Sequence, residues 1–157
     1  MQEKTLAEKG FTLIELLAVV LIIGILTAIA FPKYQKAATR SKYAELKNLT
    51  NSIYYAQKRY FLANGTYANT FDKLDIQIKD GSTTNQVRYG TIGQYCSISI
   101  SSTYQFCINE KIHLSYIVYF SGLRRCKAYE NNQIAHSICQ EETGKTNTND
   151  YPYPDKI

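Results

Sequence analysis

The residues of this chain with the most reactive side chains are four cysteines and two histidines, all in its second half: Cys96, Cys107, His113, Cys126, His136 and Cys139. No two cysteines have the two-to-four-residue spacing of a zinc ligand pair, and the histidines do not complete a zinc-finger pattern with them. An even number of cysteines in a small region favours two disulfides formed in an oxidising compartment. We therefore expect disulfides and no metal, with three connectivities open.

The sequence shows no catalytic motif. His113 and His136 are isolated, and no triad, phosphate-binding loop or metal-ligand set accompanies them. The net charge of +5 is only mildly basic, and 14 tyrosines with no tryptophan fit a secreted, surface-forming domain better than a nucleotide-using enzyme. We predict that the protein is not an enzyme and needs no cofactor.

One carboxylate, Glu15, lies near the start of a long apolar segment. It is the only charged side chain from Phe11 to Phe31. As a helix, a segment of this length measures roughly 32 Å at about 1.5 Å per residue, enough to cross a hydrocarbon core. An ionised carboxylate in lipid is costly unless it is paired or protonated, so Glu15 requires a partner unless it lies at the headgroups.

An amphipathic pattern follows Pro32. Apolar residues recur every three or four positions, which predicts that the same helix continues through 32–63 with one apolar stripe: Leu46, Leu49, Ile53, Ala56, Tyr60 and Ala63. Pro32 should kink the helix, because it lacks an N–H and crowds the carbonyl four residues earlier. Asn64-Gly65 is a helix stop.

The remaining residues, 64–157, predict a small head. Residues 64–93 indicate an irregular connection with a short helical turn at Phe71–Leu74, and the chain from Gly144 onward indicates a surface tail. Four strands separated by turns are expected between them, over 95–101, 104–109, 114–120 and 124–129. The predicted fold class is therefore α+β, with a long N-terminal helix packed on a small antiparallel sheet.

The first predicted hairpin would bring Cys96 opposite Cys107 if Ser101-Ser102 formed a two-residue turn. That register also puts Ile98 opposite Gln105 and turns two aromatic residues of the second strand to the other face. A slip of one residue exchanges the faces of a strand, so either a bulge intervenes or this pairing is wrong.

Gly10-Phe11-Thr12-Leu13-Ile14-Glu15, with the short polar leader before it and the apolar helix after it, resembles the N-terminus of a type IV prepilin. The resemblance implies that residues 1–10 are a leader, that a prepilin peptidase cuts after Gly10, and that Phe11 is then N-methylated. It also implies that Glu15 pairs with the N-terminus of a neighbouring subunit. Gly24 and Pro32 stand where many members carry helix-weakening residues.

The same resemblance implies a pilin-like fold and a C-terminal loop closed by Cys126 and Cys139. Each disulfide could be worth about 3 kcal/mol. The implied function is a structural subunit of a type IV pilus or pilus-like filament, made of copies of this chain or other pilin subunits. The precursor would lie in the inner membrane, and the mature subunit would lie in an extracellular filament.

Two alternatives concern processing and orientation. Ala28-Ile29-Ala30 resembles a signal-peptide cleavage site, which would leave a soluble protein beginning at Phe31, but Glu15 and the continuing helix argue against it. A basic run just after the apolar segment would place the N-terminus outside by the positive-inside rule: Lys33, Lys36, Arg40 and Lys42. The more specific cleavage motif implies a cytoplasmic leader.

Two alternatives concern function. A pseudopilin of a type II secretion system, in a periplasmic pseudopilus, would share the first 60 residues, but such proteins usually have a calcium site and lack this cysteine set. A minor pilin that binds DNA for uptake would need a basic surface, for which Arg124, Arg125 and Lys127 with nearby Tyr129 are candidates. The same residues would also suit an edge strand protected by charge.

Overall fold

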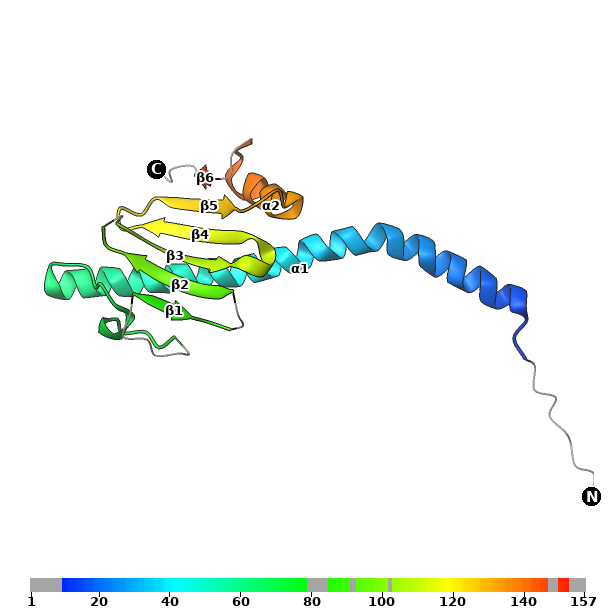
Figure 1. The fold of residues 1–157 in the computed structure, drawn as a ribbon, viewed down its shortest axis with the longest axis horizontal. Helices are drawn as coiled ribbons and strands as arrows, with labels where there is room; N and C mark the ends of the chain where they lie inside the picture. The colour runs from blue at the N-terminus through cyan, green and yellow to red at the C-terminus, as the bar shows by residue number, and fades with distance from the viewer. Residues whose placement is uncertain (1–9, 79–84, 91–92, 102, 147–149, 153–157) are drawn as a thin grey trace, which may run out of the picture. The chain divides into compact units, whose positions relative to one another are not determined.

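The computed structural model describes residues 10–78, 85–90, 93–101, 103–146 and 150–152 (Figure 1). The chain divides into two compact units, Met1–Ala37 and Ala38–Ile157. The first contains the beginning of helix α1 (Leu13–Asn64), and the second contains the rest of α1 and the head.

Helix α1 remains helical through both Gly24 and Pro32, and the predicted kink stays a prediction. The predicted stop is confirmed, because Gly65 adopts a φ of 71° and its N–H donates to the Phe61 carbonyl over 2.8 Å. This left-handed cap needs a residue without a Cβ penalty, which is why glycine ends the helix here.

The head contains one antiparallel sheet in which each strand pairs with the next along the chain. Its strands are β1 (Gln86–Arg88), β2 (Gln94–Ser99), β3 (Tyr104–Asn109), β4 (Leu114–Tyr119), β5 (Arg124–Ala128) and β6 (Asp150–Pro152). The predicted meander is confirmed, since β2 to β5 match the four expected strands with ends shifted by at most two residues.

Three elements were missed. Strand β1 lies in the segment predicted as an irregular connection, and β6 lies in the segment predicted as a tail. Helix α2 (Gln133–Thr143) begins where the Asn132 side chain accepts from the Ala135 N–H over 3.0 Å. The short helices η1 (Phe71–Lys73) and η2 (Glu110–Ile112) complete the head, and η1 confirms the predicted helical turn.

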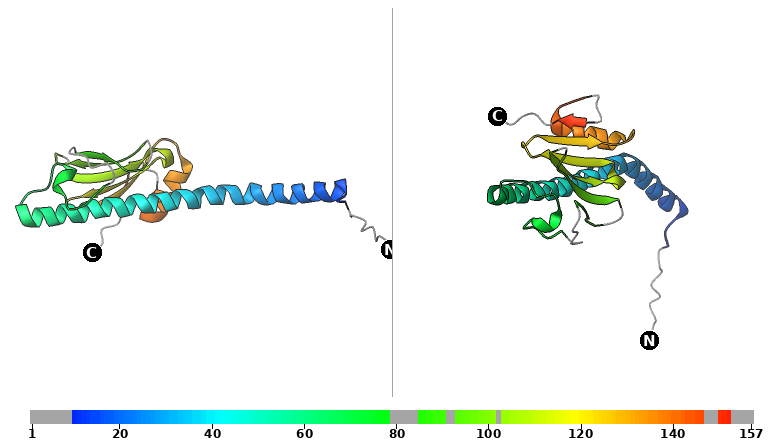
Figure 2. Two further views of the ribbon diagram at one scale, coloured as in Figure 1. Left: turned by 90° about the horizontal axis from the view of Figure 1, so that it is seen from below. Right: turned by 60° about the vertical axis from the view of Figure 1, so that its left-hand side comes forward.

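The core lies between one face of the sheet and the part of α1 that belongs to the head (Figure 2). The rings of Tyr43 on α1 and Tyr116 on β4 meet edge to face, 6.2 Å apart. The buried side of this helix is rotated from the predicted stripe: Tyr43, Leu46, Thr50, Ile53, Ala56 and Gln57 are buried, whereas Ala63 is exposed. Thr50 and Gln57 are polar, so the hydrophobic pattern of the sequence did not identify them as buried.

The first hairpin has the predicted register without a bulge in its ladder. Cys96 pairs with Cys107 and Ile98 with Gln105, and Ser102 of the predicted turn lies outside the described residues. The register does turn Gln105 toward the core, where its carboxamide is fully buried and has no hydrogen-bond partner among the described residues. The predicted pairing is therefore confirmed, although it buries the polar side chain of Gln105 against the core.

Both expected disulfides are present. Cys96–Cys107 crosses between β2 and β3, with the Cα atoms 4.0 Å apart. Cys126–Cys139 connects β5 to α2, with the Cα atoms 5.5 Å apart.

Candidate processing and assembly site

The predicted processing residues precede the first turn of α1. Gly10 and Phe11 are exposed, and the Phe11 side chain has 86% of its surface accessible. The helix begins two residues later, at Leu13. The Gly10–Phe11 peptide bond therefore lies in exposed, non-helical backbone.

Thr12 and Glu15 form a capping box at the start of α1. The backbone N–H and the hydroxyl of Thr12 donate to Glu15 Oε2 over 2.8 and 2.7 Å, and the Glu15 N–H donates to Thr12 Oγ1 over 3.3 Å. The reciprocal bonds satisfy N–H groups that have no partner within the helix. Sequence reasoning treated Glu15 as a charge awaiting a partner and missed this local one, although the T-x-x-E spacing was visible.

The apolar segment after the capping box is exposed in the single chain. Its large apolar side chains, from Leu13 to Phe31, each expose between 46% and 81% of their surface. Within the part of the chain that the structure describes, α1 is the helix long and apolar enough to cross a membrane, with a mean hydropathy of 2.8 over 18 residues. An apolar surface of this extent must be covered by lipid or protein.

Two basic residues of α1 beyond the apolar segment, one of them from the basic run, are paired within the head. Arg40 forms an ion pair with Glu141, and Lys47 Nζ lies 2.5 Å from Glu142 Oε2. Both acceptors belong to α2, which the Cys126–Cys139 disulfide holds on β5. The C-terminal helix is therefore tied both to the sheet and to α1.

A buried carboxamide fixes the chain after α1. Gln57 Nε2 donates to the Ala68 carbonyl over 2.8 Å, and Gln57 Oε1 accepts from the Ala68 N–H over 2.9 Å. Arg59 adds a bidentate pair with Asp75, at 2.6 and 2.7 Å. The hydrogen bond from Arg59 lowers the pKa of Asp75. Together these contacts hold residues 68–75 against the helix.

The predicted basic strip is divided between the two faces of the sheet, because neighbouring residues of a strand point to opposite faces. Arg124 lies on the face toward α1, diagonal to Tyr116 in the ladder, and burial there raises the pKa of the Tyr116 hydroxyl. On the opposite face, the Arg125 guanidinium lies 5.3 Å from the Tyr119 ring centroid. Lys127 Nζ on that face is 5.2 Å from the Tyr129 centroid. The three cations therefore do not form one strip.

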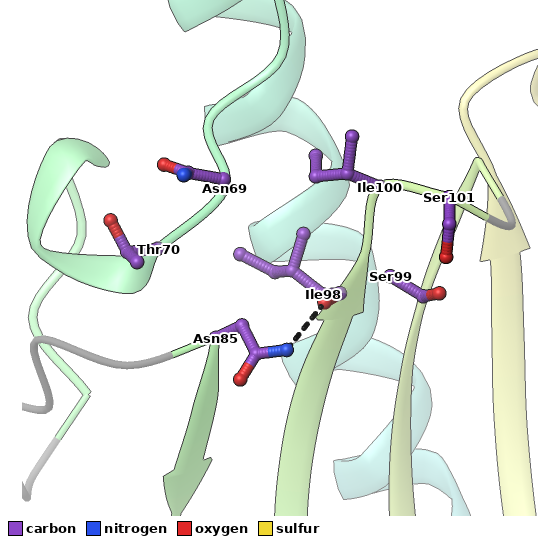
Figure 3. Close-up of a pocket in the computed structure, with 7 residues that line it drawn as sticks. All are labelled: Asn69, Thr70, Asn85, Ile98, Ser99, Ile100 and Ser101. Atoms are coloured by element: carbon purple, nitrogen blue, oxygen red, sulfur yellow. Dashed lines mark hydrogen bonds between the residues drawn. The ribbon is translucent and has the colours of Figure 1, made fainter.

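A shallow pocket of about 440 Å³ opens between the segment after α1 and the start of the sheet (Figure 3). Asn69 and Thr70 border one side, and Ile98 and Ile100 border the other. Asn85 is held between them by a 3.4 Å hydrogen bond from its Nδ2 to the Ile98 carbonyl. Among the described residues that line the pocket there is no histidine, cysteine or carboxylate, so these residues include no side chain suited to act as a general base.

The long helix and the antiparallel sheet packed on its second half define a pilin-like α+β protein. Residues 6–31 match the family model of the prokaryotic N-terminal methylation motif. No solved structure matches the chain.

Proteins similar in sequence include the type IV major pilin protein PilA of Myxococcus xanthus, 42% identical over 82 residues, which are 52% of this chain and 35% of that protein. Fimbrial protein EcpC of Eikenella corrodens is 47% identical over 60 residues, 38% of this chain and 39% of its own. A fimbrial protein of Pseudomonas aeruginosa is 35% identical over 85 residues, 54% of this chain and 55% of its own. The chain thus matches about a third to a half of the length of these relatives. The N-terminal part of the chain is therefore similar to proteins of the type IV pilin family.

Proposed function

We propose that this protein is a structural subunit of a type IV pilus, made as an inner-membrane precursor and polymerised through α1. The observation that carries the proposal is the exposed apolar segment that lies within the match to the N-terminal methylation motif. A segment of this kind has two physically suitable surroundings, lipid before assembly and other copies of the same helix after it. The relatives named type IV major pilin and fimbrial protein favour this function over a secretion pseudopilin or a DNA-uptake subunit.

Processing prepares the chain for assembly. Prepilin peptidase would cut the exposed bond after Gly10 and methylate Phe11, which places a new amino group close to Glu15. The new terminus would lie directly before Thr12 of the capping box, in backbone that the helix does not hold. A positive charge is thereby created in the one part of the apolar segment that contains a carboxylate.

Glu15 would have one partner in the precursor and another in the filament. In the single chain both Thr12 bonds go to Oε2, while Oε1 has no partner among the described residues. The capping box lowers the cost of holding the carboxylate near lipid but supplies no opposite charge. In the filament the Phe11 amino group of a neighbouring subunit would supply that charge. This pairing would set the register between neighbouring subunits, because a misplaced subunit would leave an unpaired charge in an apolar bundle.

The test is the substitution Glu15→Val in the full chain, with Glu110→Val in the head as a matched control. We expect both variants to be processed and inserted into the membrane, since the cleavage bond is unchanged and the first becomes more apolar. The Glu15→Val variant should be strongly depleted from the sheared filament fraction, whereas the control should match wild type. Filament and membrane fractions are compared by immunoblot. A normal filament yield from Glu15→Val would show that Glu15 has no role in assembly.

A further inference from the structure

The face of the sheet opposite α1 has more aromatic and apolar side chains than a solvent-facing sheet usually has. An antiparallel sheet with one face on a core normally alternates apolar-in and polar-out. Here β2, β3 and β4 direct aromatic or branched apolar residues outward: Tyr95, Tyr104, Phe106, Ile117 and Tyr119. Serines take most of the remaining outward positions on β2 and β4. We call these residues, with the outward cations of β1 and β5, the outer face.

The aromatic rings of the outer face form a continuous run across three strands. Ring centroids are 6.1 Å apart for Tyr95 and Phe106, 6.0 Å for Phe106 and Tyr104, and 5.4 Å for Tyr104 and Tyr119. Each of these rings is half-buried by its neighbours. Figure 2 shows α1 along the other face of the sheet and no helix across this one. A contiguous apolar surface of this kind marks an interaction site.

Positive charge flanks the aromatic run. Strands β1 to β5 contain four cations and no aspartate or glutamate, so the sheet has a single sign of charge over these five strands. Arg88 is exposed on β1, where it pairs in register with Tyr95, and Lys127 lies on β5 at the other side. On β6, Asp150 pairs in register with Lys127, and Glu110 and Glu130 follow the ends of β3 and β5. Over β1 to β6, the three outward cations Arg88, Arg125 and Lys127 therefore stand against this one acidic residue, and the sheet keeps a net positive charge. This distribution attracts an anionic partner.

The ring geometry favours sugars over nucleic-acid bases. Neighbouring rings in the run are inclined to one another by 54° to 73°, so they do not offer parallel faces to consecutive stacked bases. The outer face is instead rich in hydroxyl groups, from Tyr95, Tyr104 and Tyr119 and from Ser97 and Ser99. Hydroxyl groups both donate and accept, which suits the hydroxyls of a saccharide.

We propose that the outer face binds an acidic polysaccharide. The apolar C–H surfaces of its sugar rings lie against the aromatic run, its hydroxyls bond the tyrosine and serine hydroxyls, and its carboxylates lie near Arg88 and Lys127. This binding needs only the head of one subunit. It therefore goes beyond the proposed assembly function and can be tested without filaments.

The test measures binding of the full chain in detergent micelles to three fluorescently labelled probes by anisotropy at low salt. These are oligogalacturonate, its methyl ester, which keeps the sugar rings and removes the charges, and oligo(dT) of equal charge. We expect the oligogalacturonate to bind at least about fivefold more tightly than either of the others. Equal binding by oligo(dT) would show a general polyanion or nucleic-acid surface and overturn the proposal. Equal binding by the methyl ester, or no binding at all, would also overturn it.

Substitutions test whether the binding occurs on the outer face. Lys127→Ala removes a flanking cation, and Tyr104→Ala removes a ring from the middle of the run. We expect each to bind oligogalacturonate about three- to tenfold more weakly, while Lys73→Ala, which removes an exposed cation of η1, stays within about twofold of wild type. Tyr104→Phe, which keeps the ring, should retain more affinity than Tyr104→Ala and guards against a folding defect. If the outer-face variants behave like Lys73→Ala, the proposal is wrong.

Discussion

The substitution Gln57→Leu removes the carboxamide that connects α1 to the segment after it. Gln57 is fully buried, and both of its polar atoms are paired with the backbone of Ala68, which is 1% exposed. Leucine has a similar volume but no polar group. The variant therefore leaves the N–H and the carbonyl of Ala68 buried and without their partner.

The expected loss of stability follows from these two orphaned groups. A buried donor or acceptor left unsatisfied costs about 1–3 kcal/mol, so the pair amounts to about 2–6 kcal/mol. Burial of the more apolar leucine offsets part of this. We expect the free energy of unfolding to fall by about 2–4 kcal/mol. For a unit of this size, roughly 3–5 °C per kcal/mol gives a decrease in Tm of roughly 6–20 °C.

Thermal unfolding of the full chain in detergent, followed by near-UV circular dichroism of the tyrosines, measures the effect. Gln77→Leu is the matched control, because it makes the same chemical change at an exposed position. Its free energy of unfolding should stay within about 0.5 kcal/mol of wild type. If Gln57→Leu unfolds at the same temperature as this control, the two hydrogen bonds to Ala68 do not hold the segment after α1.

Three further results are expected. Replacing Cys126 and Cys139 together by serine should lower the free energy of unfolding by about 3 kcal/mol, measured in urea, and an unchanged midpoint would contradict this. Because the hydrogen bond from Arg59 lowers the pKa of Asp75, their pair stabilises the head above the ordinary carboxyl pKa, and this contribution is lost as the pH falls through the native pKa. The stability difference between wild type and Asp75→Asn should therefore shrink toward low pH, and a difference that grows would refute the assignment. Intact-mass analysis of the purified protein should show a chain that starts at methylated Phe11, whereas a start at residue 31 would support signal-peptide cleavage.

Local signals in the sequence were sufficient for the helix and its N-terminal motif. Three signals each depend on residues a few positions apart: the apolar run, the glycine that ends α1 and the hexapeptide that ends at Glu15. For the same reason the four central strands and the hairpin that joins Cys96 to Cys107 could be predicted from alternation and turn residues.

The short strands and the buried polar residues could not be predicted from the sequence, because long-range contacts determine them. Strands β1 and β6 have three residues each, too few for a period-two pattern, and they form because β2 and β5 offer unpaired edges. Thr50 and Gln57 are buried without being apolar, because backbone carbonyl groups accept their hydrogen bonds and the Ala68 N–H donates to Gln57. A hydrophobic stripe read along α1 could not include them.

The surface of the head was likewise decided by tertiary structure. In the sequence, Arg124, Arg125 and Lys127 are nearly consecutive and suggest one basic strip. Strand alternation sends Arg124 toward α1 and Lys127 to the outer face, where the neighbours of Lys127 come from other strands. The sequence shows which charged and aromatic residues the head contains. Which of them share a face depends on the register in which β1 to β5 pair in the folded sheet.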